Sequence, residues 1–124
     1  MDNTAKYTER KTFVQFDNGH YLLYLNETAA EVETGEDENK TTVAGFAYTG
    51  DMSDGSTKIA ASDVNDDNRR AKFVAGLIGK RYSIDDQIAI LANGSRTTTY
   101  ADEQQAFEAY RAACKSAVDE LLSR

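Results

Sequence analysis

The first half of the chain has the apolar runs and turn signals of β-strands. Residues 12–16 are mostly β-branched or aromatic, and residues 21–25 form a second apolar run. Between them, Asn18-Gly19 is typical of a type I′ turn, because both residues tolerate positive φ. The pattern predicts a β-hairpin whose second strand is apolar on both faces, lies centrally in its sheet, and continues through Thr28 to Glu33.

A second hairpin is expected farther along the chain. The acidic, glycine-led segment 35–40 is a turn signal, and residues 41–48 again have the composition of a strand. Residues 50–56 are rich in turn-forming residues and precede a short strand at 57–61. Consecutive hairpins predict an antiparallel sheet of about four strands.

After Asp63 the apolar spacing changes towards the period of a helix. A first helix is predicted with Asp63 or Asp66 as its cap and with Gly79 and the basic pair Lys80-Arg81 at its end. Its apolar side consists of Phe73, Val74, Leu77 and Ile78.

Two further helices follow. Residues 83–86 (Ser-Ile-Asp-Asp) have the spacing of a capping box, and the helix that they open ends at Asn93-Gly94. The last helix has Asp102 as its expected cap. The apolar stripe of the shorter helix is Ile84, Ile88 and Leu91, and that of the last helix is Phe107, Tyr110, Cys114, Val118 and Leu121. We interpret the longer stripe as a core face, with a partner-binding face as the alternative.

A chain of 124 residues has the usual size of one domain, and two separate halves would each be too small to bury a stable core. We therefore expect a single domain over residues 1–124, β-rich from about residue 10 to 62 and helical from about 63 to 124. The predicted class is α+β, with an N-terminal antiparallel sheet packed against two or three C-terminal helices.

The formal net charge of −7 argues against nucleic acid and anionic membranes as partners. The basic clusters 69–72 and 80–81 fit a solvated helix face and a helix end better than an anion site. No apolar stretch reaches the roughly 18–20 residues of a membrane span, and the N-terminus lacks the apolar core of a signal peptide. These features predict a cytoplasmic protein.

Candidate metal and phosphate motifs are incomplete. Residues 63–67 begin like a calcium loop, but the sixth position is Asn68 instead of glycine and the twelfth is Val74 instead of glutamate. Residues 76–81 lack the spacing and the hydroxyl residue of a phosphate loop. We predict no metal site and no cofactor.

No catalytic constellation is evident either. Cys114 lies on the apolar stripe of the last helix, and His20 adjoins a turn, so neither has the partners of a catalytic nucleophile or base. A pair of dispersed carboxylates is the one enzymatic arrangement that the sequence leaves open. We therefore predict no catalytic residues.

From Lys80 onward the order of motifs is distinctive: residues 82–91, a spacer, Phe107-Glu-Ala-Tyr-Arg111 and Cys114-Lys115. It resembles the C-terminal portion of small uncharacterised proteins encoded beside tail and baseplate genes in prophages of gut bacteria. The resemblance covers the last third of the chain. It implies a virion-structural or assembly-accessory role and no catalytic residues.

Together these features favour a non-catalytic interaction or assembly-accessory protein, prophage tail-associated, that binds a protein partner or itself. The first alternative is a small ligand- or cation-binding domain. The second, which the sequence favours less, is an enzyme that uses dispersed carboxylates.

Overall fold

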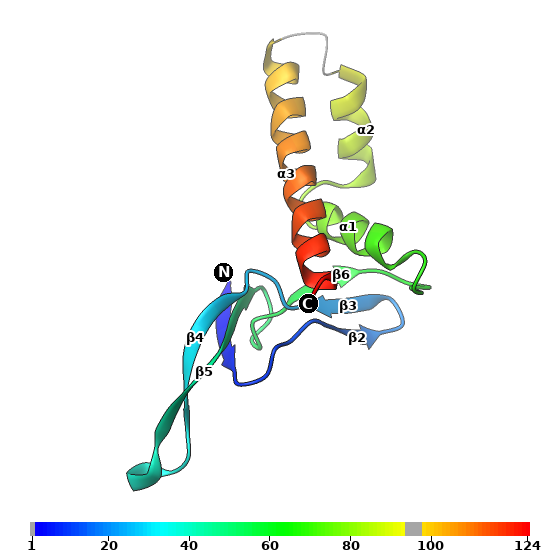
Figure 1. Ribbon diagram of the computed structural model, residues 1–124. Helices are drawn as coiled ribbons and strands as arrows, with labels where there is room; N and C mark the ends of the chain where they lie inside the picture. The colour runs from blue at the N-terminus through cyan, green and yellow to red at the C-terminus, as the bar shows by residue number, and fades with distance from the viewer. Residues whose placement is uncertain (1, 94–97) are drawn as a thin grey trace. The chain divides into compact units, whose positions relative to one another are not determined.

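The computed structural model describes residues 2–93 and 98–124, and it confirms an α+β fold (Figure 1). One compact unit runs to Lys58 and also includes Arg124, and the other runs from Ile59 to Ser123. The elements are β1 (Asn3–Tyr7), β2 (Phe13–Asp17), β3 (His20–Leu23), β4 (Thr28–Thr34), a 3₁₀ turn (Asp37–Asn39), β5 (Thr41–Gly50), β6 (Thr57–Ala60), α1 (Arg69–Gly79), α2 (Ile84–Asn93) and α3 (Thr98–Leu122). The change from strands to helices therefore lies close to where the sequence predicts it.

The predicted hairpin of β4 and β5 is confirmed, and it forms an antiparallel sheet of order β1-β5-β4. The turn depends on Gly35, whose φ is +90° and where a Cβ would lie 2.5 Å from the carbonyl oxygen of Asn39. The strand β1 was not predicted. Its residues are mostly polar and exposed, so only its pairing with β5 identifies it.

The other sheet has the order β2-β3-β6, which confirms a central position for β3. The β2–β3 hairpin forms around Asn18-Gly19, but neither residue is among the described positions with positive φ, so the type I′ prediction is wrong. Instead the ladder is irregular between Gln15 and Asp17, and the Asp17 carboxylate accepts the N–H of Gly19 at 2.8 Å. This side-chain contact stabilises a different turn.

The prediction that β3 continues to Glu33 is wrong, because the chain changes sheets after Leu23. Asn26 has φ of 56°, which interrupts an extended strand, and its side-chain amide donates to the carbonyl oxygen of Thr49 at 3.0 Å. The chain then enters β4 in the sheet that contains β5. Among the described residues, six strands in two sheets of three thus replace the single sheet of about four strands.

In the helical unit, α3 packs against both α1 and α2. The predicted apolar sides of α1 and α3 are buried, and the Tyr110 hydroxyl, on the α3 stripe, donates to the carbonyl oxygen of Leu77 at 3.0 Å. The buried members are Phe73, Val74, Leu77, Ile78, Phe107, Cys114, Val118 and Leu121. The stripe of α3 is therefore a core face, as expected, whereas packing of helices on a sheet and folding as one domain stay predictions.

The predicted helix caps have mixed outcomes. The capping box of α2 is confirmed: the N–H of Asp86 donates to Ser83 Oγ at 3.0 Å, and the N–H of Ser83 donates to Asp86 Oδ2 at 3.2 Å. By contrast, α1 begins only at Arg69, so Asp63 and Asp66 do not cap it.

The turn before α1 is closed by an amide side chain instead, because Asn65 Oδ1 accepts the N–H groups of Asp67 and Asn68. Asp102 is not a cap either, since α3 begins at Thr98 and Asp102 lies inside it. Gly94, expected at the end of α2, lies outside the described residues.

Candidate interaction surface

The most exposed large apolar side chains of the described residues lie together on α2. Ile84 is 71% exposed, Ile88 is 61% exposed and Leu91 is 54% exposed. Spacings of four and three residues place them on one side of the helix, which we call the α2 face. The predicted amphipathic pattern is thus present, but its apolar side is not part of the core.

The opposite side of α2 anchors it. Gln87, Ile90 and Asn93 are partly buried on the side that packs against α3. The Gln87 amide donates to the carbonyl oxygen of Tyr82 at 3.2 Å, close to the capping box of Ser83. The α2 face is therefore presented by a helix held at its first turn and along its other side.

A groove of about 440 Å³ borders the α2 face. Its floor is apolar and includes Val74 and Ile78, whereas Arg111 and Lys115 of α3 make one wall cationic. The remaining lining residues are Arg70, Ala71, Ala75, Ile84 and Gln87. We call this cavity the α1–α3 groove.

Arg70, at the edge of the α1–α3 groove, is neutralised by Asp119. Its guanidinium donates to both carboxylate oxygens, at 2.6 and 3.1 Å, and this contact lowers the pKa of Asp119. Arg111 and Lys115 have no ion pair with any described residue. The net positive charge of the groove therefore comes from α3.

A second cavity, of about 430 Å³, lies on the other side of α2, between α2 and α3. Arg81, Asp86 and Glu103 bring charges of both signs to its lining. The other lining residues are Tyr82, Ala89, Ile90, Asn93 and Ala106. Asp86 is already engaged in the capping box, and the Arg81 guanidinium lies 5.1 Å from the centre of the Tyr110 ring. The volume of the cavity and its charges of both signs suit a small polar ligand.

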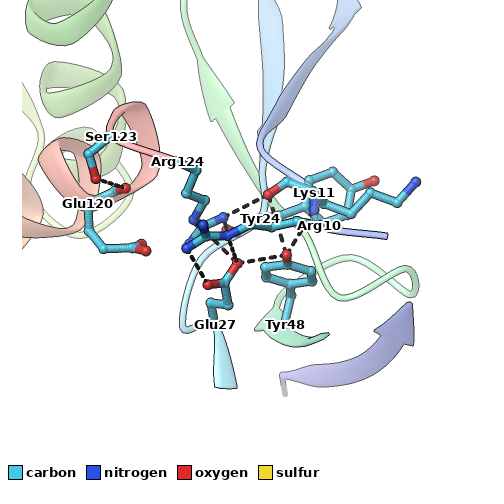
Figure 2. A network of polar contacts seen from close by, with 8 residues as sticks. All are labelled: Arg10, Lys11, Tyr24, Glu27, Tyr48, Glu120, Ser123 and Arg124. Carbon is cyan, nitrogen blue, oxygen red and sulfur yellow. Dashed lines mark hydrogen bonds and ion pairs between the residues drawn. The ribbon is translucent and has the colours of Figure 1, made fainter. Parts of the chain in front are cut away.

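The β-rich unit holds a network of ionisable groups around Glu27 (Figure 2). Arg10 donates to both Glu27 oxygens, at 2.8 and 3.1 Å, and the Tyr48 hydroxyl donates to Glu27 at 2.8 Å. The Arg10 hydrogen bonds are the main reason that the pKa of Glu27 is lowered.

The side chain of Arg124 completes this network and is only 1% exposed (Figure 2). Its Nη1 donates to the carbonyl oxygens of Lys11 and Tyr24, at 2.9 and 2.6 Å, and its Nε lies 3.5 Å from Glu27. Every group of this network is engaged with another protein group. The arrangement therefore fits a structural network rather than a site that binds a substrate.

Asp54 is another half-buried carboxylate of the same unit. The pKa of Asp54 is lowered overall. Burial alone would raise it, but the hydrogen bonds from Ser56 and from the Tyr24 hydroxyl together outweigh burial. Ser56 donates its N–H at 2.9 Å, and the Tyr24 hydroxyl donates at 2.9 Å. Burial and this carboxylate together raise the pKa of Tyr24. These contacts hold the loop between β5 and β6.

The other residues singled out from the sequence are dispersed. His20 Nδ1 lies 2.8 Å from the Asp17 carboxylate at the β2–β3 turn. Within residues 2–93 and 98–124, no three His, Cys, Asp or Glu side chains are grouped so that they could hold a metal ion. The predicted absence of metal and cofactor stays a prediction.

Cys114 is buried in the helical unit, with 5% of its surface exposed. Burial is the main reason that the pKa of its thiol is raised, so the reactive thiolate is scarce at neutral pH. We expect a thiol reagent to label it slowly in the native protein and rapidly in denaturant. Rapid stoichiometric labelling of the native protein would contradict the buried assignment and favour a reactive cysteine.

Comparison with known proteins found no match among protein families, curated proteins or solved structures. None of the helices in the described part of the chain has the length and apolar character needed to cross a membrane. The exposed α2 face and the α1–α3 groove beside it are the features of the described residues that bear most directly on function. The sequence revealed the apolar pattern of this face, but no signal in it distinguishes an exposed stripe from a buried one.

Proposed function

We propose that this protein is a non-catalytic interaction and assembly module that binds a protein partner through the α2 face. The observation that carries the proposal is the exposure of Ile84, Ile88 and Leu91 on one side of an anchored helix. Exposed aliphatic side chains that are grouped and bordered by polar residues are typical of protein-binding surfaces.

The physical gain from covering this face is large. Burying a fully exposed large aliphatic side chain contributes about 1.5–3 kcal/mol, and these three side chains expose more than half of their surface. A helix face with anchors spaced by four and three residues matches the way in which helices dock into apolar grooves. The neighbouring α1–α3 groove extends the apolar surface.

Two further observations support a protein as partner. The net charge of −7 disfavours nucleic acid and anionic lipid. The resemblance of the segment from Lys80 onward to prophage proteins from tail and baseplate gene regions agrees with an assembly role. We include association with a virion in the proposal on that ground.

The cavity between α2 and α3 favours a second function, binding of a small polar ligand. Its size lies within the range of ligand pockets, and Arg81 and Glu103 could contact groups of opposite charge. This alternative ranks lower because none of the described residues that line the cavity is a buried polar side chain.

Photo-crosslinking tests the proposed function directly. A photoreactive phenylalanine analogue at Leu91 should join the protein to a partner, either its own chain or another, when it is expressed in its native cells. The same analogue at Ala109, an exposed position of α3 away from the α2 face, is the matched control. Equal crosslinking from both positions, or none from Leu91, would contradict a docking role for the α2 face.

A further inference from the structure

We propose that the outer edge of β4 binds an extended segment of a protein partner as an added β-strand, and that this segment alternates basic and aliphatic residues. The edge belongs to the β-rich unit, so this inference goes beyond the α2 face and does not depend on it. Three features carry it: the unpaired backbone of β4, the two-stranded ribbon that β4 forms with β5, and the side chains on the two sides of that ribbon.

The backbone of β4 is open along one edge. β4 is an outer strand of its sheet, and among the described residues only β5 supplies hydrogen-bond partners to its backbone. In an antiparallel sheet every second residue of an outer strand directs its N–H and C=O groups away from the sheet. β4 therefore offers these groups to the backbone of another chain, which is how extended peptides add to sheets.

The edge of β4 lacks most of the features that protect outer strands, which are short length, proline and bulges. It has seven residues, whereas the outer strands β1, β2 and β6 have five, five and four. It contains no proline, and its register with β5 is regular from Thr28 to Thr34. The protection that remains is negative charge, which opposes an acidic strand and attracts a basic one.

The outer part of the ribbon lacks a third strand. β1 pairs with β5 only from Phe46 to Gly50, whereas β4 pairs with β5 as far as Thr41. Beyond the end of β1, β4 and β5 continue as a two-stranded ribbon (Figure 1). Two strands alone are marginally stable in water, and a third strand stabilises them. A strand added to β4 therefore completes a three-stranded sheet in this segment.

The two sides of the ribbon determine which strand fits. Glu31 and Glu33 lie on one side, and their partners on β5 are small and uncharged. Val32 lies on the other side, opposite Val43, which is 39% exposed. An added strand that alternates Lys or Arg with Val or Ile places its basic side chains beside the glutamates and its aliphatic side chains beside the valine pair.

The charges of the ribbon favour a basic partner over a second copy of this chain. Residues 28–44 include five acidic residues and one basic residue, Lys40. Lys40 lies 3.9 Å from Glu33, and both side chains are more than half exposed, so this contact neutralises little charge. Glu31 has no ion pair with any described residue. The β4 edge of a second copy would add its own carboxylates to the same side of the sheet, and like charges on neighbouring strands repel.

Fluorescence anisotropy with the full chain tests the proposed binding. The probe is a capped, fluorophore-labelled peptide, Thr-Lys-Val-Lys-Val-Lys-Thr, and we expect saturable binding with a dissociation constant on the order of 100 micromolar. The double variant Glu31→Gln/Glu33→Gln should weaken binding about 3- to 10-fold, because it removes both cross-strand charge pairs. Asp67→Asn/Glu108→Gln removes the same charge from exposed positions of the helical unit and should leave binding unchanged.

A second peptide separates strand addition from attraction between charges. Methyl groups on the backbone nitrogens of every lysine and valine keep the charge of the probe but remove the N–H groups that pair with β4, so this peptide should not bind saturably. Hydrogen exchange measured by NMR locates the site. The unmethylated peptide should protect alternate amides of β4 and leave those of residues 41–45 in β5 unchanged.

The inference would be overturned by the absence of saturable binding, by equal effects of the two double variants, or by equal binding of the methylated peptide. Protection of residues 41–45 in place of β4 would also overturn it. Crosslinking from Leu91 tests the α2 face separately, so failure of one proposal is distinguishable from failure of the other.

Discussion

Replacing Phe107 by alanine is expected to lower the free energy of unfolding by about 3–5 kcal/mol, a large share of the stability of a small domain. The side chain is 2% exposed, and its ring contacts Tyr82 edge to face, with the ring centres 5.0 Å apart. Alanine removes this contact between α3 and the residue that precedes the capping box of α2. Urea denaturation at neutral pH measures the change.

Arg111→Ala is the matched control on the same helix, because Arg111 is exposed on the groove side. We expect it to change stability by no more than about 0.5 kcal/mol. If Phe107→Ala left the unfolding midpoint unchanged but abolished association, the stripe of α3 would be an interface and not a core face. Ile88→Asp, on the exposed α2 face, should show the opposite behaviour, with stability retained and binding of the protein partner lost.

Replacing Glu27 by alanine is expected to cost about 3–5 kcal/mol, because it leaves the guanidinium of Arg124 buried without its carboxylate. The Arg124 side chain is 1% exposed and that of Glu27 is 14% exposed, so water cannot replace the lost contact. The Tyr48 hydroxyl also loses its acceptor. Thermal or urea unfolding measures the loss.

Glu33→Ala is the control for this change. Glu33 is 73% exposed and lies 3.9 Å from Lys40, so its removal should alter stability by no more than about 0.5 kcal/mol. Equal effects of the two substitutions would show that the Arg124 network does not stabilise the fold.

The pH dependence of stability tests the same network through its charge. The folded-state pKa of Glu27 lies below its ordinary value of 4.5, so its contribution is fully present above that pH. It is lost as the pH falls through the lowered value, since the unfolded chain then binds a proton more readily than the folded one. Glu27→Gln should therefore lose less stability on acidification than the wild-type protein does.

The sequence by itself determined the features that depend on neighbours along the chain. The apolar sides of α1 and α3 follow from helical spacing, because residues three and four apart share a face wherever the helix lies. The capping box at Ser83 and Asp86 and the turn at Gly35 likewise depend on local backbone geometry. These predictions were correct for that reason.

Only the tertiary structure decided how distant segments use those local features. The polar segment β1 becomes a strand because β5 supplies its hydrogen-bond partners, and the positive φ of Asn26 sends the chain into a second sheet. The pairing of Glu27 with Arg124 joins residues that lie far apart in the sequence, so no local pattern predicts it.

The α2 face also combines a feature set by the sequence with one set by the tertiary structure. Spacing along α2 determined that Ile84, Ile88 and Leu91 share one side, but whether that side is buried depends on which elements pack against the helix. Because α3 covers the side with Gln87 and Ile90, the aliphatic residues remain exposed. The spacing of residues in the sequence determines the side of the helix from which each side chain projects. Whether that side is exposed depends on the other elements that pack against the helix. For this reason only the tertiary structure reveals the α2 face.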